Sequence, residues 1–160
     1  MSNIQALIQQ LERYAQEELD LQTRTLVALR EQEAALFHGD LALMRANVER
    51  VDAQLEGCVA RSARRNELLR RFGLHFGVAP STLTLTSICT RLGSPADGLA
   101  RIAAPLRETA LAVTRATRRL GALARMHARL NDEILKEVLA VQGVDPKDME
   151  RCGALVDAQV

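Results

Sequence analysis

Apolar residues recur at alternating spacings of three and four along the last third of the chain, with polar residues between them. This stripe consists of Leu99, Ile102, Leu106, Val113, Ala116, Leu120, Leu123, Leu130, Ile134 and Val141. Only Thr109, His127 and Glu137 interrupt it. Such spacing places one residue per turn on the same side of an α-helix, as in the seam of a coiled coil. The pattern predicts one long helix over about 95–142 that packs against other helices.

The ends of this long helix are marked by local signals as well. Ser94, Pro95 and Asp97 supply an N-cap, a proline at the first helical position and an acid in the first turn. Pro105 lacks an N–H and crowds the preceding turn. We therefore expect it to kink or divide the helix, although the apolar phase passes through it unchanged. Gly143 ends the pattern.

Two more long helices are expected in the first half of the chain. A first apolar series predicts a helix over about 3–37. Gly39 and Asp40 then interrupt the pattern, and the carboxylate of Asp40 can cap the start of a second helix. This second helix is predicted over about 41–72, ending before Gly73. Its apolar positions are Leu41, Met44, Val48, Val51, Leu55, Val59 and Leu69.

Glycine and proline punctuate residues 73–98, which form the connection between the two halves of the chain. The run Thr82–Thr86 alternates threonine with leucine, as a β-strand does, but no second alternating run exists to pair with it. Because an isolated strand is not stable, the segment predicts a short helix over about 84–92 instead.

Composition agrees with an all-α fold. The 160 residues are 48% hydrophobic and 26% charged, but only 2% are aromatic. So little aromatic bulk fills only a slim core. We expect an elongated bundle or hairpin of three long helices with a short helix in the connection, as a single domain over 1–142. Residues 143–160 are expected to be a tail that is mobile alone and orders against a partner.

The net charge of +1 hides an uneven distribution of charge. The first helix is acidic, whereas seven arginines and a single acid lie between Arg101 and Arg129 of the last helix, so the two helices can neutralise each other. These arginines lie away from the seam, and no helix-turn-helix spacing, stacking aromatic residues or zinc ligands accompany them. We interpret them as a solvated face rather than as a nucleic-acid site.

No arrangement of residues indicates catalysis, a cofactor or a metal. Cys58, Cys89 and Cys152 are odd in number and form no CxxC pair, which argues against a disulfide framework or a zinc site and fits a reducing cytoplasm. The HExxH, phosphate-loop and nucleophile-elbow motifs are absent. We expect no signal peptide, because residues 1–10 lack a charged start and an apolar core, and no run of about 18 apolar residues occurs. We expect a cytoplasmic protein that is neither an enzyme nor inserted in a membrane.

The end of the last helix carries the clearest candidate site. After Asn131, positions that held arginine upstream hold Leu135 and Leu139. A helix that is apolar over most of its circumference must be covered on more than one side. Either the other helices or a twin subunit cover it, or it forms a groove for the amphipathic helix of another protein. In the second hypothesis the hydrogen-bonding edge and the apolar anchors are Asn131, Ile134, Leu135, Val138, Leu139 and Val141.

The order of these elements resembles that of the FlgN-like flagellar export chaperones over about residues 5–142. The resemblance rests on Glu33-Ala34-Ala35-Leu36, Gly39-Asp40-Leu41, Arg64-Arg65-Asn66-Glu67-Leu68-Leu69 and Asn131-Asp132-Glu133-Ile134-Leu135. It implies a cytoplasmic all-helical protein that guards hook-associated (hook-filament junction) proteins before secretion. The helical termini of those proteins polymerise into a coiled tube, and a matching apolar face would keep them unassembled until export.

The chain departs from the family pattern at two places. Such chaperones often have two asparagines three residues apart, whereas here Ala128 stands three residues before Asn131. A C-terminal tyrosine, linked in some members to docking at the flagellar export gate, has no counterpart, because Tyr14 is the only tyrosine. Hook-associated proteins are thus the partners that the resemblance implies, with the export gate as a further one. The alternatives are a homodimeric coiled-coil protein, in which His127 and Glu137 set the register, and a helical regulator that binds nucleic acid.

Overall fold

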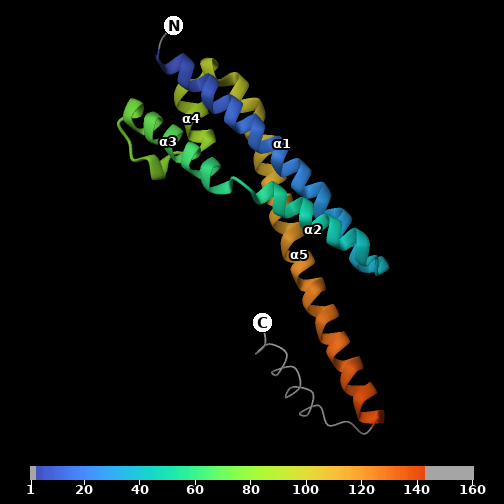
Figure 1. Cartoon of the computed structure of the whole chain (residues 1–160). Coiled ribbons are helices and arrows are strands. Elements are labelled where there is room, and N and C mark those ends of the chain that lie inside the picture. Colours follow the sequence, from blue (N-terminus) through green and yellow to red (C-terminus); the bar gives the residue numbers. More distant parts are fainter. Residues whose placement is uncertain (1–2, 143–160) are drawn as a thin grey trace. The chain divides into compact units, whose positions relative to one another are not determined.

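The computed structural model describes residues 3–142, and every regular element in that part of the chain is helical (Figure 1). The expected all-α fold is therefore confirmed. The α-helices are α1 (Asn3–His38), α2 (Leu41–Leu55), α3 (Cys58–Phe76), α4 (Leu85–Leu92) and α5 (Asp97–Gln142), and the 3₁₀ turns are η1 (Pro80–Thr82) and η2 (Ser94–Ala96). The expected tail over 143–160 lies outside the described residues.

The predicted second helix over 41–72 is two helices in the structure, so the expected arrangement of three long helices is not found. Gly57 separates α2 from α3 with a φ of 72°, in the left-handed region that glycine adopts without steric cost. The guanidinium of Arg61 donates hydrogen bonds to the carbonyl oxygens of Gln54 and Glu56, at 3.1 and 2.7 Å. It thereby satisfies carbonyl groups that the end of α2 leaves without helical partners.

Helix α3 also continues past its predicted end near Phe72. Gly73 is buried inside the helix, and a Cβ at this position would lie 2.8 Å from the carbonyl oxygen of Val78. Glycine is needed here because the following loop approaches the helix closely. The helix ends at Gly77 instead, where a φ of 66° gives the left-handed C-cap that commonly terminates helices.

The threonine-rich run caps a helix and forms no strand. Thr84 is the N-cap of α4, and its hydroxyl accepts a hydrogen bond from the backbone N–H of Ser87 at 3.1 Å. The hydroxyl of Ser87 accepts in return from the N–H of Thr84 at 2.8 Å. Asp40 caps α2 as expected, since its carboxylate accepts from the N–H of Leu43 at 2.9 Å. Each cap satisfies donors that the first helical turn leaves unpaired.

Helix α5 runs through Pro105 without division. Proline removes only one backbone donor from the helix, and the apolar side chains on both sides of it stay in phase. Ile102 and Leu106 flank the proline, and both pack against the hydrophobic core. Packing of this kind explains why the helix tolerates the proline here.

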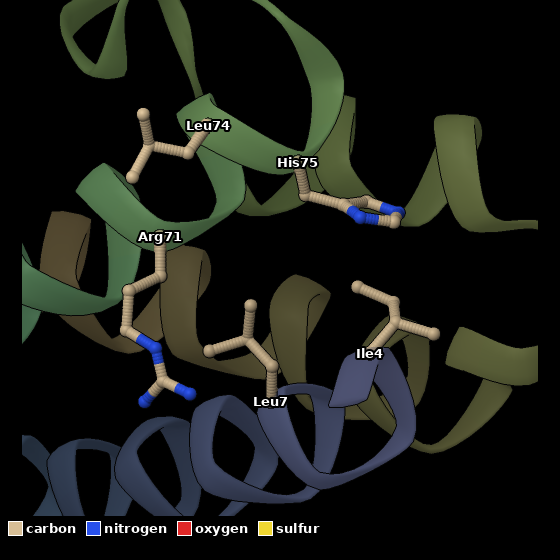
Figure 2. Close-up of a pocket in the computed structure, with 5 residues that line it drawn as sticks. All are labelled: Ile4, Leu7, Arg71, Leu74 and His75. Atoms are coloured by element: carbon tan, nitrogen blue, oxygen red, sulfur yellow. The ribbon is translucent and has the colours of Figure 1, made fainter. Parts of the chain in front are cut away.

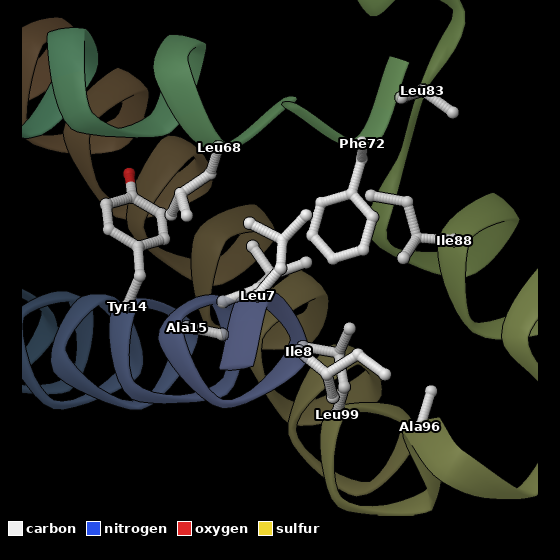
Figure 3. Close-up of a cluster of buried hydrophobic side chains, with 11 residues drawn as sticks. Leu7, Ile8, Tyr14, Ala15, Leu68, Phe72, Leu83, Ile88, Ala96 and Leu99 are labelled. Atoms are coloured by element: carbon white, nitrogen blue, oxygen red, sulfur yellow. The ribbon is translucent and has the colours of Figure 1, made fainter. Parts of the chain in front are cut away.

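The hydrophobic core gathers around the first half of α1 (Figure 3). It contains Leu7, Ile8, Leu11, Tyr14, Ala15, Leu68, Phe72, Leu83, Ile88, Ala96 and Leu99. Phe72 of α3, Ile88 of α4 and Leu99 of α5 are fully buried in it. Because burial of a large apolar side chain contributes about 1.5–3 kcal/mol, these three contacts hold α3, α4 and the start of α5 against α1.

Helix α1 and the α2–α3 arm run antiparallel. Four side-chain contacts define the register: Gln10 with Arg71, Glu17 with Arg64, Thr25 with Gln54, and Glu31 with Arg50. From one contact to the next, each step forward along α1 is matched by an equal step backward along α2 and α3, to within two residues. This holds both before and after Gly57. The break therefore leaves the register unchanged. Glu17 and Glu31 pair with arginines of α3 and α2 rather than with those of α5.

The chain divides into two compact units, and the division falls inside α5. The first unit comprises residues 1–118 and holds the whole core. The second unit begins at Arg119 and is described as far as Gln142, as a single length of helix. Within residues 3–142, no helix combines the length and the apolar character needed to cross a membrane.

Candidate protein-interaction surface

The apolar stripe of α5 is covered in its first part. Leu99 is fully buried in the core, and Ala116 is only 7% exposed. Ile102 and Leu106 are half-buried and pack against the same core cluster. This part of the stripe therefore serves the fold, because it attaches the first part of α5 to the other helices.

Beyond Arg119, Leu120 and Leu123 of the stripe are half-buried, but most of the large apolar side chains that follow them in α5 are exposed. Six of these side chains have exposed fractions from 46% for Val138 to 87% for Val141. We call this set the distal face: Met126, Leu130, Ile134, Leu135, Val138 and Val141. Single exposed apolar residues are common on proteins, but a continuous row of them along one helix is typical of a surface that binds a partner.

The six residues predicted for partner binding all lie in this part of α5, and four of them belong to the distal face. Asn131 is exposed as well, and Leu139 is half-buried. The sequence prediction did not include Met126 and Leu130. Their signal was present, because they begin a row of apolar residues at every fourth position that continues through Ile134, and such rows form ridges on a helix.

Charged side chains border the distal face on one side. A hollow of about 470 Å³ lies along α5 here and is lined by Ala122, Arg125, Met126, Arg129, Leu130 and Glu133. It combines an apolar floor with a charged edge. Nearby, Lys136 pairs with Asp132 at 2.6 Å, but both side chains are largely exposed. An exposed pair of this kind contributes little to stability.

Another hollow, of about 380 Å³, lies in the first unit between the start of α1 and the end of α3 (Figure 2). Ile4 and Leu7 line it from α1, and Arg71, Leu74 and His75 line it from α3. His75 carries the only imidazole of the five, and none of the others is an acid or a nucleophile. The hollow can accept an apolar side chain but has no pair of groups for acid–base chemistry.

Burial shifts the pKa of two side chains in the first unit. Burial raises the pKa of the Cys89 thiol, and a thiol with a raised pKa stays protonated and unreactive at neutral pH. Burial also raises the pKa of the Tyr14 phenol. Residues 3–142 contain no group of three or more histidine, cysteine or acidic side chains placed to hold a metal ion.

Comparisons with known proteins assign no family. No family model matches the chain, and neither a curated protein nor a solved structure matches it. The feature that indicates a function is therefore the distal face, with its row of exposed apolar side chains and its charged border.

Proposed function

We propose that this chain is a cytoplasmic export chaperone of the bacterial flagellum, which binds the helical termini of hook-associated proteins and keeps them unassembled until secretion. The observation that carries the proposal is a change along one stripe of α5, which is buried at Leu99 and exposed at Leu130 and Ile134. The core is complete without the distal face. A helix that extends such an apolar row beyond the core needs a partner to cover it.

The identity of the partner comes from the order of the elements, which resembles that of the FlgN-like chaperones. A cargo helix would lie along the row from Met126 to Val141, which spans about 24 Å at 1.5 Å per residue. The apolar stripe of a hook-associated terminus is the surface that otherwise pairs with further copies, so covering it prevents assembly. The distal face contains no aromatic residue. This suits a contact that must later be released, because aromatic anchors usually dominate tight interfaces.

Size-exclusion chromatography with light scattering tests the proposal. The full chain is measured alone and mixed with the C-terminal helix of a hook-associated protein from the same organism. We expect a stoichiometric complex that Leu135→Asp abolishes, because an aspartate would place a charge in the apolar contact. The matched control is Leu111→Asp, since Leu111 is also a leucine of α5 and is 47% exposed, against 51% for Leu135. Circular dichroism should show unchanged helicity in both variants.

Three results would count against the proposal. A wild-type chain that forms no complex with the helix would refute it. A stable homodimer that ignores the helix would make the distal face a subunit interface and would favour the homodimeric coiled-coil alternative. Equal loss of the complex in Leu135→Asp and Leu111→Asp would show that the substitutions act through the helix as a whole rather than through the distal face.

A further inference from the structure

Helix α2 lies along the second half of α1 (Figure 1), but in the described part of the chain it contributes no side chain to the hydrophobic core. Four of its large apolar side chains are exposed: Leu41, Leu43, Val48 and Leu55. Helix α3, by contrast, places Phe72 in the core with no exposed surface. Because the burial of apolar surface is the main favourable term in folding, α2 is held in place less firmly than α3.

The contacts that hold α2 against α1 are mostly polar. Arg50 pairs with Glu31 at 2.6 Å, but both side chains are about half exposed, at 53% and 43%. An exposed pair of this kind contributes little to stability. The hydroxyl of Thr25 donates to the amide oxygen of Gln54 at 2.9 Å, and the net contribution of such a hydrogen bond is modest, because water replaces it when the helices separate. Neither contact makes α2 inseparable from α1.

The buried residue of α2 favours separation rather than packing. Asn47 is fully buried, and its amide nitrogen and oxygen have no hydrogen-bond partner in the described part of the chain. The closed position of α2 therefore takes this amide out of water without replacing its hydrogen bonds. If α2 moves away, the amide regains water, so Asn47 lowers the free energy needed to open this part of the fold.

A glycine flanks each end of α2. Gly39 and Gly57 have φ values of 68° and 72°, in the left-handed region. Around Gly39 there is open space, since a Cβ there would meet no other atom within 4 Å. Hinges are commonly a few residues at the ends of helices that absorb changes in φ and ψ, and glycine accepts such changes at the lowest steric cost. Both ends of α2 can therefore turn while α1 and α3 keep their helical geometry.

We propose that α2 is a detachable arm, which releases from α1 at the hinges Gly39 and Gly57 and returns while the hydrophobic core stays folded. The chain then has a closed state and an open state that share one core. Local openings of this kind draw on the elements with the fewest buried apolar contacts, and α2 fits that description. The inference concerns the first unit and is independent of the chaperone proposal, which rests on the distal face.

Native-state hydrogen exchange of the full chain, followed by mass spectrometry, tests the proposal. We expect the backbone amides of α2 to be at least about tenfold less protected than those of α3. Leu99→Ala removes a fully buried core side chain and should speed exchange in α3 by about thirtyfold or more. It should leave exchange in α2 unchanged, because the core is folded in both the closed and the open state. Asn47→Leu should slow exchange in α2 about fivefold, since the closed state no longer buries an unpaired amide.

Three results would overturn the inference. Equal protection of α2 and α3 in the wild-type chain would mean that α2 opens only when the whole chain unfolds. Equal acceleration of both helices in Leu99→Ala would show the same, since the two would then open as one cooperative unit. Faster exchange of α2 in Asn47→Leu would mean that the buried amide holds the arm closed. Ile88→Val, a smaller loss in the same core, provides the same comparison between α2 and α3 if Leu99→Ala does not fold.

Discussion

Asn47 is fully buried in α2, and neither its amide nitrogen nor its amide oxygen has a hydrogen-bond partner in the described part of the chain. Leaving a buried polar group unpaired costs about 1–3 kcal/mol. We expect Asn47→Leu, which replaces the amide with an apolar group of similar size, to raise the free energy of unfolding by about 1 kcal/mol. Urea denaturation measures this change. Asn47→Asp is the control and should destabilise, because it buries a charge. A loss of stability in Asn47→Leu would mean that the amide contributes to the packing of α2.

Tyr14 is the only tyrosine, so its ionisation can be followed alone. Burial raises the pKa of its phenol above the ordinary value of 10.0, the charge of Glu18 raises it further, and Arg65 opposes the rise. The folded chain therefore keeps this proton at a pH at which the unfolded chain has begun to lose it. The resulting contribution to stability is fully present below pH 10.0 and is lost as the pH rises through the folded pKa.

The ultraviolet absorbance of the phenolate provides the measurement for Tyr14. We expect its titration midpoint to be higher in the native chain than in the urea-unfolded chain. Tyr14→Phe should also remove the part of the alkaline loss of stability that belongs to this group. Equal midpoints in the two states would contradict the burial of the phenol.

Long periodic elements could be predicted from the sequence, and breaks between them could not. The first helix was expected over about 3–37 and is found as Asn3–His38, because a long apolar series carries a strong signal. The break at Gly57 could not be predicted in this way, since the apolar spacing before it is regular and a single glycine is tolerated within a helical pattern. Gly73 is expected to follow the end of the second helix but lies inside α3. Two contacts explain where these helices end and continue. The guanidinium of Arg61 binds the last carbonyl groups of α2, and the loop at Val78 approaches α3 at Gly73. Both contacts form only when the chain folds, so the helical pattern of the sequence does not indicate them.

Gly57→Ala tests whether the left-handed conformation separates α2 from α3. A non-glycine residue in that conformation costs about 1–2 kcal/mol, and the strain is relieved if the backbone there becomes helical. We expect a lower free energy of unfolding in urea together with a gain in helical circular dichroism. Gly77→Ala is the matched control: its φ is 66°, but it lies at the end of α3, so it should lose stability without gaining helicity. An unchanged stability of Gly57→Ala would show that the break does not depend on the left-handed glycine.

Across the chain as a whole, the sequence predicted the apolar stripe of α5 but not which part of it would be covered. Leu99 and Ile134 follow the same periodic pattern. They differ because α1, α3 and α4 contribute the other side chains around Leu99, and these residues are distant in sequence. The roles proposed for Asn131 and Leu139 stay predictions, since they depend on a partner. A pattern within one helix indicates what must be covered, whereas tertiary contacts decide what covers it.

The two parts of the stripe should therefore separate stability from binding. Leu99→Ala removes a fully buried side chain and should lower the free energy of unfolding by about 2–5 kcal/mol. Ile134 is 53% exposed, so Ile134→Asp should change it by no more than about 0.5 kcal/mol while it weakens binding of the cargo helix. Urea unfolding followed by circular dichroism, at several protein concentrations, measures the change in the free energy of unfolding for both variants. Size-exclusion chromatography with the cargo helix measures the change in binding. A loss in Ile134→Asp well above that limit would mean that the distal face is already covered in the free chain. If that loss also grew with protein concentration, the cover would be a second copy, because only association makes stability depend on concentration.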